Sequence, residues 1–233
     1  DVTVTVSDNV TTIVTVSDTV AYVDEIAPAN YTVSAVLVPG GAGTEPLMSV
    51  TVLGIEDKGL VEEGLGTGQL EVTVTDGSVT VVSTGPVTGA TELASGIDVS
   101  SLAYGSLTVA AKVSDAALDA DGTLAPNAGA LITTVSPVAY DDVIAPVATI
   151  DSVTINPVTG LVTAVLDPIV DKGIGESGGL LSISVTDGTS TVGGAGDDVA
   201  LGAGSTAGTI SVDANALMYG QLSVTVTVSD NVS

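Results

Sequence analysis

Residues 2–10 read VTVTVSDNV, and residues 224–232 repeat the same nine letters. A related phrase, LTVAAKVSD, stands at residues 107–115, so a unit of roughly 110 residues recurs along the chain. Each phrase alternates apolar and polar residues up to a Ser-Asp pair, which is typical of a half-buried β-strand that stops at a turn. The repeat therefore predicts a tandem array of similar β-units, and we expect the chain to be a section of a longer repetitive polymer.

The composition of the 233-residue chain excludes several classes of function. There is no Cys and no His, which rules out a Cys/His zinc site, a thiol nucleophile and a Ser/His/Asp triad. Only three basic residues accompany 28 acidic ones, and the resulting net charge of −25 would repel nucleic acids and anionic membranes. The sequence has no apolar run of about 18 residues that could span a membrane. We therefore expect no catalysis, no nucleic-acid partner and no direct membrane insertion.

Short phrases recur in the same order in two segments of the chain. The pairs are DEIAP at 24–28 with DDVIAP at 141–146, DKG at 57–59 with DKG at 171–173, TDG at 75–77 with TDG at 186–188, and LAYG at 102–105 with LMYG at 217–220. We expect residues 1–23 to be a fragment of a preceding repeat or a donor strand. Residues 24–140 then form the first full unit, and residues 141–233 form a second unit that lacks its last strand.

The strand pattern predicts an all-β fold made of immunoglobulin-like sandwiches with Greek-key topology. Alternating runs bounded by Gly, Asp, Asn or Pro give about seven short antiparallel strands in each unit, and no segment sustains a 3.6-residue period. The second strand is expected at residues 49–54 of the first unit and 161–166 of the second, and the third strand at residues 69–75 and 180–186. The last strand is expected at residues 12–23 of the fragment and 130–140 of the first unit. Tyr104 and Tyr219 are expected to be the corner tyrosines of the two sandwiches.

Acidic residues are concentrated on three segments that this topology brings to one end of each unit. These segments are the linker before the first strand, the loop between the second and third strands, and the loop after the sixth strand. The candidate residues are Asp24, Glu25, Glu56, Asp57, Glu62 and Asp115 in the first unit, and Asp141, Asp142, Asp167, Asp171, Glu176 and Asp230 in the second. Only Lys58 and Lys172 offer a positive charge nearby.

Such a cluster of carboxylates favours a hard divalent cation bound through oxygen. Calcium accepts many oxygen ligands in a flexible geometry, whereas magnesium requires a stricter octahedron and keeps its waters. We therefore expect Ca²⁺ at the junctions between units, where it would stiffen the array. The alternative is that these acids are ordinary solvated turn residues, because Asp also favours turns through its own hydrogen bonds to the backbone.

Three features resemble bacterial Ig-like tandem repeats: the boundary phrase Asp-x-x-Ala-Pro, the acids after the second strand, and Leu-x-x-Gly before a strand that ends in Ser-Asp. Such repeats form the extender regions of giant secreted adhesins and biofilm-associated surface proteins. The resemblance implies an extracellular, non-enzymatic spacer whose partners are neighbouring repeats or identical subunits, joined end to end. The chain departs from the family after the sixth strand: the family commonly has Asp-Ala-Ala-Gly-Asn there, whereas this chain has Asp8-Asn9-Val10, Asp115-Ala116-Ala117 followed by Leu118, and Asp230-Asn231-Val232.

Two other functions remain open at the level of sequence. A final unit without its last strand would leave an unpaired edge, so the chain could be a self-assembling filament or surface-layer subunit, with residues 12–23 as the donated strand. A module that binds glycans through a calcium ion would need an exposed polar pocket. A monomer in solution favours the spacer, whereas ordered polymers that disappear when residues 1–23 are deleted favour strand donation.

Overall fold

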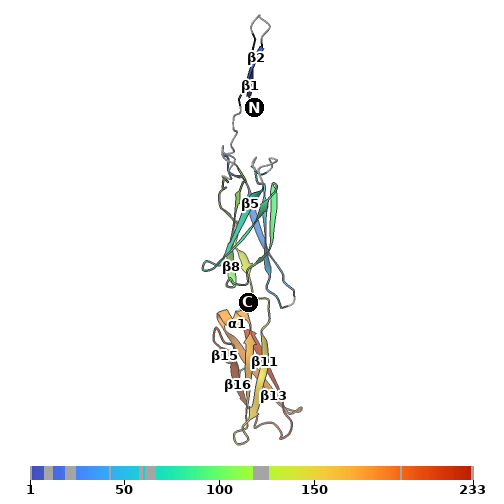
Figure 1. Ribbon diagram of the computed structural model, residues 1–233. Helices are drawn as coiled ribbons and strands as arrows, with labels where there is room; N and C mark the ends of the chain where they lie inside the picture. The colour runs from blue at the N-terminus through green and yellow to red at the C-terminus, as the bar shows by residue number, and fades with distance from the viewer. Residues whose placement is uncertain are drawn as a thin grey trace.

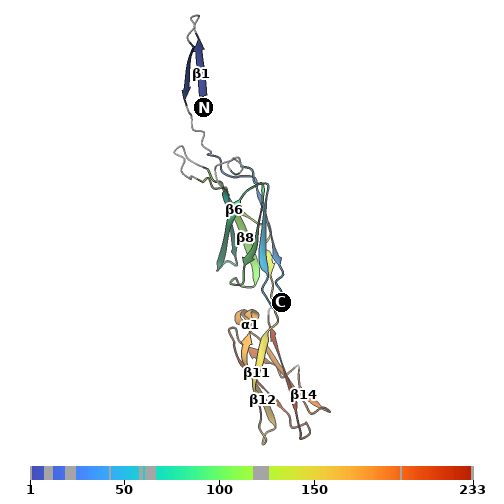
Figure 2. The same ribbon diagram turned by 45° about the vertical axis from the view of Figure 1, so that its right-hand side comes forward.

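The computed structural model contains two β-sandwiches stacked end to end, with one short helix where they meet (Figures 1 and 2). The structure describes the backbone of residues 2–7 and 13–18, and it describes residues 25–41, 43–57, 60, 67–117, 126–194 and 196–231 in full. Nearly all regular structure in these segments is antiparallel β-strand. The all-β, Ig-like sandwich prediction is therefore confirmed.

The first sandwich consists of two antiparallel sheets. One sheet has the strand order β3 (Thr32–Val38), β4 (Leu47–Leu53), β7 (Thr91–Asp98). The other sheet has the strand order β10 (Val138–Tyr140), β8 (Gly105–Ser114), β5 (Gly68–Thr75), β6 (Thr80–Val87). β9 (Ile132–Thr133) also pairs with β8. Alternate residues on these strands face inward, so Met48, Val50 and Val52 of β4 are fully buried. The aliphatic alternation seen in the sequence thus becomes a thin core between two sheets.

The second sandwich repeats this arrangement. One sheet has the order β11 (Val147–Ile155), β12 (Leu161–Val170), β16 (Gly208–Asp213); in the other, β13 (Gly179–Thr186) pairs with β14 (Thr191–Gly193), β15 (Val199–Leu201) and β17 (Ser223–Asp230). Its core is separate from the first one and contains Leu166, Leu181 and Ile210. Within the described residues, β17 pairs with β13 alone, whereas its counterpart β8 also pairs with β9 and β10.

A short helix, α1 (Lys172–Ser177), lies in the loop between β12 and β13, where the sequence predicted only a loop. Asp171 caps its first turn by accepting a hydrogen bond from the Ile174 N–H at 2.9 Å, and Gly178 ends it with φ 76°. Ile174 is fully buried in the second core and anchors the helix. No helix among the described segments has the length and apolar character needed to cross a membrane.

The first two strands form an antiparallel pair of their own. β1 (Val2–Ser7) and β2 (Ile13–Asp18) pair in a register that places Val2 opposite Asp18 and Val4 opposite Val16. In the described residues they make a two-stranded sheet that is separate from both sandwiches.

Candidate functional site at the junction of the two sandwiches

The end of the first sandwich that faces the second is ordered by the Thr-Asp-Gly turn between β5 and β6. Asp76 Oδ1 accepts hydrogen bonds from the N–H groups of Ser78 and Val79, and Oδ2 accepts one from the Ala103 N–H at 2.8 Å. These backbone hydrogen bonds, the one from Ala103 above all, hold the pKa of Asp76 below its ordinary value. The turn therefore fixes the loop that carries Tyr104.

The second sandwich uses the same device at its far end. Asp187 accepts hydrogen bonds from the N–H groups of Thr189 and Ser190 within its turn, and from the Met218 N–H at 2.8 Å. The recurring Thr-Asp-Gly phrase thus positions a tyrosine-bearing loop in both units. Tyr219, the counterpart of Tyr104, is fully exposed there.

Tyr104 and Tyr140 form an edge-to-face pair at the junction, with ring centroids 4.9 Å apart and an interplanar angle of 62°. The two carboxylate oxygens of Glu45 lie 2.8 Å from the Tyr104 hydroxyl and 2.9 Å from the Tyr140 hydroxyl. Burial raises the pKa of both tyrosines, and the hydrogen bonds to Glu45 raise it further. Both hydroxyls are therefore protonated donors at neutral pH.

Lys172, the first residue of α1, extends from the second sandwich to this tyrosine pair. Its Nζ donates to the Leu102 carbonyl at 2.6 Å and to the Tyr140 hydroxyl at 2.9 Å. The same ammonium lies 4.3 Å from the centroid of each ring, within the range of a cation–π contact. One lysine of the second unit is thus held by two rings and a carbonyl of the first.

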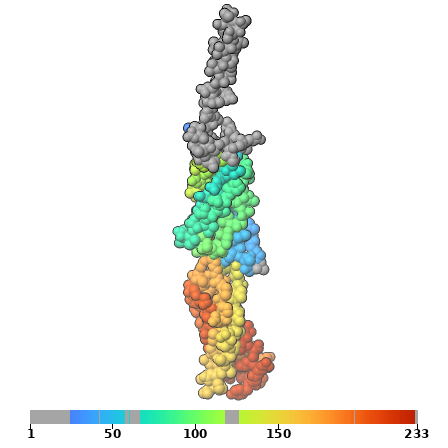
Figure 3. Space-filling model, in the orientation of Figure 1, coloured from blue at the N-terminus to red at the C-terminus, as the bar shows by residue number. Residues whose placement is uncertain are grey.

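Glu176 adds a second contact one turn along the same helix. Its Oε2 accepts a hydrogen bond from the Tyr104 N–H at 3.0 Å, and its Oε1 lies 3.8 Å from Lys172 Nζ. Figure 3 shows the surface around α1 (orange) pressed against the end of the first sandwich. We refer to Glu45, Tyr104, Tyr140, Lys172 and Glu176 as the tyrosine–lysine junction.

The expectation that Tyr104 and Tyr219 are the corner tyrosines of the two sandwiches was wrong. A corner tyrosine bonds to the backbone of its own sandwich, whereas the Tyr104 hydroxyl reaches the carboxylates of Glu45 and Asp142. Tyr219 is exposed and makes no corner either. The reason is positional: the Leu-x-x-Gly loop lies at the end of the sandwich, so its tyrosine faces the next unit.

Three carboxylates meet beside this junction, and we refer to them as the acidic trio. Asp142 comes from the linker, Asp171 from the N-cap of α1 and Asp230 from the end of β17, and ligand oxygens of the three lie within 4.8 Å of one another. Asp142 Oδ2 and Asp171 Oδ1 are buried and accept no hydrogen bond from the described residues. A Cβ at position 173 would collide with the Asp142 carboxylate, so Gly173 permits this close approach.

The electrostatics of the trio disfavour three negative charges. Burial raises the pKa of Asp171, although the hydrogen bond from the Ile174 N–H acts in the opposite direction. The charges of Asp142 and Asp230 raise this pKa further. Buried carboxylate oxygens that lack donors and repel one another are suited to ligate a hard cation.

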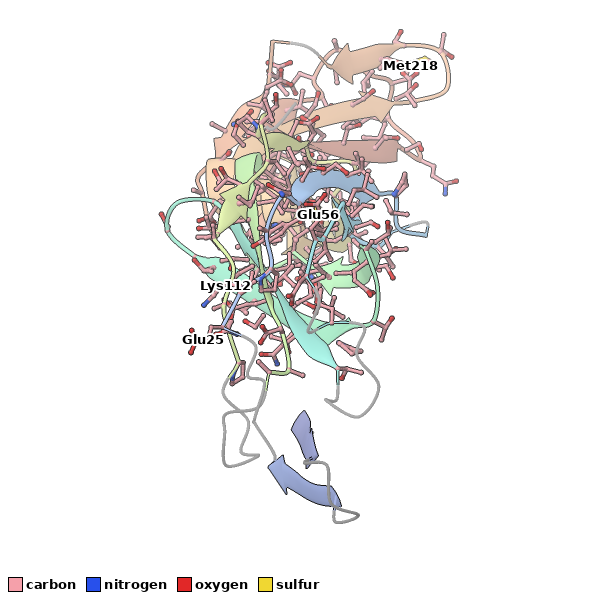
Figure 4. The ribbon with its side chains drawn as sticks, turned by 90° about the horizontal axis from the view of Figure 1, so that it is seen from above. Glu25, Glu56, Lys112 and Met218 are labelled. Atoms are coloured by element: carbon pink, nitrogen blue, oxygen red, sulfur yellow. The ribbon has the colours of Figure 1, made fainter. Side chains whose placement is uncertain are left out.

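The acids predicted for the first unit are arranged differently. Asp24 and Glu62 lie outside the described residues. Glu25 and Glu56 are both exposed, and Figure 4 shows them apart, while Glu56 accepts a hydrogen bond from Asn30 Nδ2 at 2.6 Å. Asp57 is partly buried in the loop after β4.

Asp115 is the buried acid of the first unit, with an exposure of 2%. It accepts hydrogen bonds from the Ala117 N–H at 3.1 Å, the Asn127 N–H at 2.7 Å and Asn127 Nδ2 at 3.0 Å. Protein donors therefore satisfy this carboxylate, which closes a loop. Its counterpart in the second unit is Asp230, which belongs to the acidic trio.

The remaining acids predicted for the second unit lie outside the trio. Asp141 and Asp167 are exposed, and Glu176 faces the first sandwich. The sequence placed Lys172 near these acids but did not predict its contact with the tyrosines, and it did not indicate Glu45 or Tyr140 as junction residues. A signal was present for Tyr140 and Lys172, because Ala-Tyr recurs at residues 21–22 and Asp-Lys-Gly at residues 57–59.

Comparisons with known proteins give structural similarities only. No protein-family model matches the chain, and a search of curated proteins finds no match. Among solved structures, the tetra-tandem repeat in the extending region of a large adhesion protein is similar, with 17% identity and a TM-score of 0.44 over 87% of this chain and 47% of that one. The FN1–FN3 domains of chicken CNTN1 are similar with 13% identity and a TM-score of 0.28, over 95% and 69% of the two chains. This chain therefore spans about half the length of the adhesion-protein structure.

Proposed function

We propose that this chain is a structural spacer of an extracellular surface adhesin or matrix fibre, and that it performs no chemistry. The observation that carries the proposal is the tyrosine–lysine junction. Two sandwiches that were joined by a linker alone would pivot freely, because inter-domain motion is the default for small interfaces. Here a helix of one unit is bonded into the end of the other.

The junction resists bending because its contacts come from separate parts of the interface. The Lys172 ammonium is bonded to Leu102 and stacked against two rings, while Glu176 bonds to the Tyr104 N–H from the same helix. A hydrogen bond from a charged group contributes about 1.5–3 kcal/mol and a cation–π contact about 0.5–2 kcal/mol. Tilting one sandwich away from the other would break several of these contacts together.

The acidic trio is the proposed calcium site of the spacer. Its ligands are carboxylate oxygens, two of them buried without a hydrogen-bond donor in the described segments, and a bound Ca²⁺ would supply the missing positive charge. Asp142 connects the trio to the tyrosine–lysine junction, because its Oδ1 lies 3.1 Å from the Tyr104 hydroxyl. An ion held by the linker, the helix cap and β17 would therefore also limit movement between the units.

Small-angle X-ray scattering of the full chain tests the spacer function. A rigid pair of sandwiches should scatter as one extended rod, with a cross-section that matches a single sandwich and a maximum dimension that does not change with salt. Chelating calcium should broaden the distribution of dimensions. Scattering that requires an ensemble of strongly bent conformers, both with and without calcium, would contradict a spacer role.

A further inference from the structure

Strand β3 is an edge strand of the first sandwich that lacks the usual protection against pairing with another chain. Among the described residues it pairs with β4 alone, in an uninterrupted register from Thr32 to Val38. Its seven residues, Thr-Val-Ser-Ala-Val-Leu-Val, include no charged residue, no proline and no glycine. Natural edge strands commonly avoid association through charges, prolines or bulges. The free side of β3 can therefore accept another strand.

Other edges of the two sandwiches do carry such protection. β11, the counterpart of β3, has the exposed Asp151 at its centre and two irregularities in its register with β12. β7, the opposite edge of the sheet that contains β3, includes Glu92 and has Gly96 in the left-handed region, with φ 73°. β6 contains Pro86, which has no N–H to donate. The unprotected edge is thus a property of β3 and does not follow from the fold alone.

A groove of about 600 Å³ lies beside the free edge of β3. One wall is formed by residues 33–37 of β3, and the other by residues 134–139, which include the segment between β9 and β10. Ala35 and Leu37 pack against the first core but stay partly exposed. None of the lining residues is ionisable, although the chain has a net charge of −25. Two copies can therefore meet at this edge without burying a carboxylate.

The identity of the two strands limits how β3 can pair with β3 of another copy. If both cores lie on the same side of the joint sheet, a two-fold axis makes the strands antiparallel. Core-facing residues must then lie opposite core-facing residues, because side chains alternate with a period of two. The core-facing residues of β3 are Val33, Ala35 and Leu37, so the numbers of opposite residues add up to an even total. Thr32 opposite Val38 is the register of this kind that pairs all seven residues, and any shift leaves at least two residues unpaired.

We propose that β3 binds β3 of a second copy of this chain in this antiparallel register, so that two three-stranded sheets become one six-stranded sheet. Ala35 then lies opposite Ala35 of the other copy, and Val33 lies opposite Leu37. These side chains cover the part of the first core that the groove exposes, which removes apolar surface from water. Backbone N–H and C=O groups on the free side of β3 gain the hydrogen bonds of a strand pair.

The size of the contact predicts a weak and reversible pair. A strand of seven residues is about 23 Å long, and pairing along this length buries less than the roughly 1,200 Å² of stable complexes. Repulsion between two chains of charge −25 opposes association further. Salt screens that repulsion, because the Debye length falls from about 10 Å at 0.1 M to about 3 Å at 1 M. Association should therefore strengthen with salt, whereas an interface built on ion pairs would weaken.

The strands of the first sandwich run along the length of the molecule, as Figure 1 shows, so two paired copies lie side by side and point in opposite directions. For the surface spacer proposed above, such a pair would link arrays that project from two facing surfaces. This consequence rests on the proposed function, whereas the pairing of β3 does not.

Disulfide trapping in the full-length chain tests the register, since the chain has no native cysteine. In the proposed pair, Ser34→Cys of one copy lies directly opposite Val36→Cys of another, at a Cα separation of about 4.5–5.5 Å that a disulfide can bridge. Two copies of the same variant are offset by two residues, at about 7–8 Å, which a disulfide does not bridge. Both positions are exposed, so neither substitution disturbs the core.

The two cysteine variants are mixed at millimolar concentration in a thiol–disulfide buffer, with a size tag on one of them that separates mixed from like dimers. We expect at least tenfold more mixed than like dimers. A ratio no higher than random pairing gives, an excess of like dimers, or no dimers at all overturns the proposal.

A matched pair of charge variants tests the edge itself. Val36→Glu adds a carboxylate on β3 at a side chain that is 60% exposed, and Leu93→Glu adds one on β7 at a side chain that is 62% exposed. Neither change touches a core, so both variants should fold, which circular dichroism checks. Sedimentation equilibrium at about 1 M salt should show dimers of the wild type and of Leu93→Glu, and at least tenfold weaker association of Val36→Glu.

Three results overturn the pairing: a wild type that stays monomeric at millimolar concentration in high salt, equal weakening by both substitutions, and dimers that neither substitution weakens. None of these results bears on the rigidity of the tyrosine–lysine junction, so a failure of this proposal is distinct from a failure of the spacer function.

Discussion

Replacing Lys172 by Met should uncouple the two sandwiches without unfolding either of them. Methionine keeps the length and apolar character of the stem, but it removes the ammonium that donates to the Leu102 carbonyl and the Tyr140 hydroxyl. Each of those hydrogen bonds contributes about 1.5–3 kcal/mol and the ring contacts about 0.5–2 kcal/mol. Because the side chain is 22% exposed, the lower ends of these ranges apply, and the loss at the interface is about 3.5 kcal/mol.

A loss of this size changes the equilibrium between docked and undocked sandwiches, and it leaves the stability of each sandwich unchanged. Each 1.4 kcal/mol is about a tenfold change, so the ratio of undocked to docked molecules should rise about 300-fold. The second core should be unaffected, because α1 is anchored there by Ile174 while the Lys172 ammonium lies against the first sandwich. Lys112→Met on β8 is the matched control, since it removes the same charge away from the junction.

Pulsed electron paramagnetic resonance measures the effect directly. Spin labels on Thr84→Cys and Thr154→Cys, one exposed position in each sandwich, report the distance between the units without interference from native cysteine. The distance distribution should be narrow in the wild type and in Lys112→Met, and broad in Lys172→Met. An equally narrow distribution in Lys172→Met, with both sandwiches folded by circular dichroism, would refute the assigned role of the ammonium.

Two further predictions concern carboxylates. If the acidic trio binds calcium with a dissociation constant of ~0.1 mM, then ~10 mM calcium should stabilise the second unit by about 2.7 kcal/mol and raise its melting temperature by roughly 10–20 °C. Asp171→Asn keeps an oxygen to cap α1 and should abolish most of that rise; a wild-type melting curve that does not change on chelation would contradict the calcium proposal. Asp76 has a pKa below its ordinary value of 3.8, so its contribution to stability is present above that pH and is lost as the pH falls through the lowered value. Asp76→Asn should therefore be less stable than the wild type at neutral pH, and urea unfolding should show the difference in unfolding free energy shrinking below pH 3.8. A difference that stays constant with pH would contradict a stabilising role for the negative charge of Asp76.

Local patterns predicted the strands well. The expected strand at residues 69–75 is β5, Gly68–Thr75, and the one expected at 161–166 is the beginning of β12, Leu161–Val170. Alternation is a property of neighbouring residues, so it can be read without knowledge of the partners of a strand. The sequence pattern did not predict helix α1, because a segment of six residues with two glycines shows no 3.6-residue hydrophobic period. Asp171 indicated only that a helix could be capped at that position.

The acids show the limit of a repeat-based argument. Asp115 and Asp230 occupy the same position in the two phrases, and sequence treats them alike. In the structure Asn127 supplies donors to Asp115, whereas Asp230 lies in a group with Asp142 and Asp171. Asn127 lies 12 residues beyond Asp115, and Asp142 and Asp171 belong to the linker and the helix cap, so each environment depends on contacts between residues that are separated in the sequence.

The sequence by itself determined the fold class, the two repeated units and the absence of His and Cys chemistry, because each of these follows from composition or from short-range pattern. Only the tertiary structure decided that Lys172 meets Tyr104 and Tyr140, and that Asp142, Asp171 and Asp230 come together. Those features depend on how the two sandwiches stack, and the residues involved are far apart in the sequence: 70 residues separate Lys172 from Leu102. No local pattern contains that information, because the contacts form only after each unit has folded.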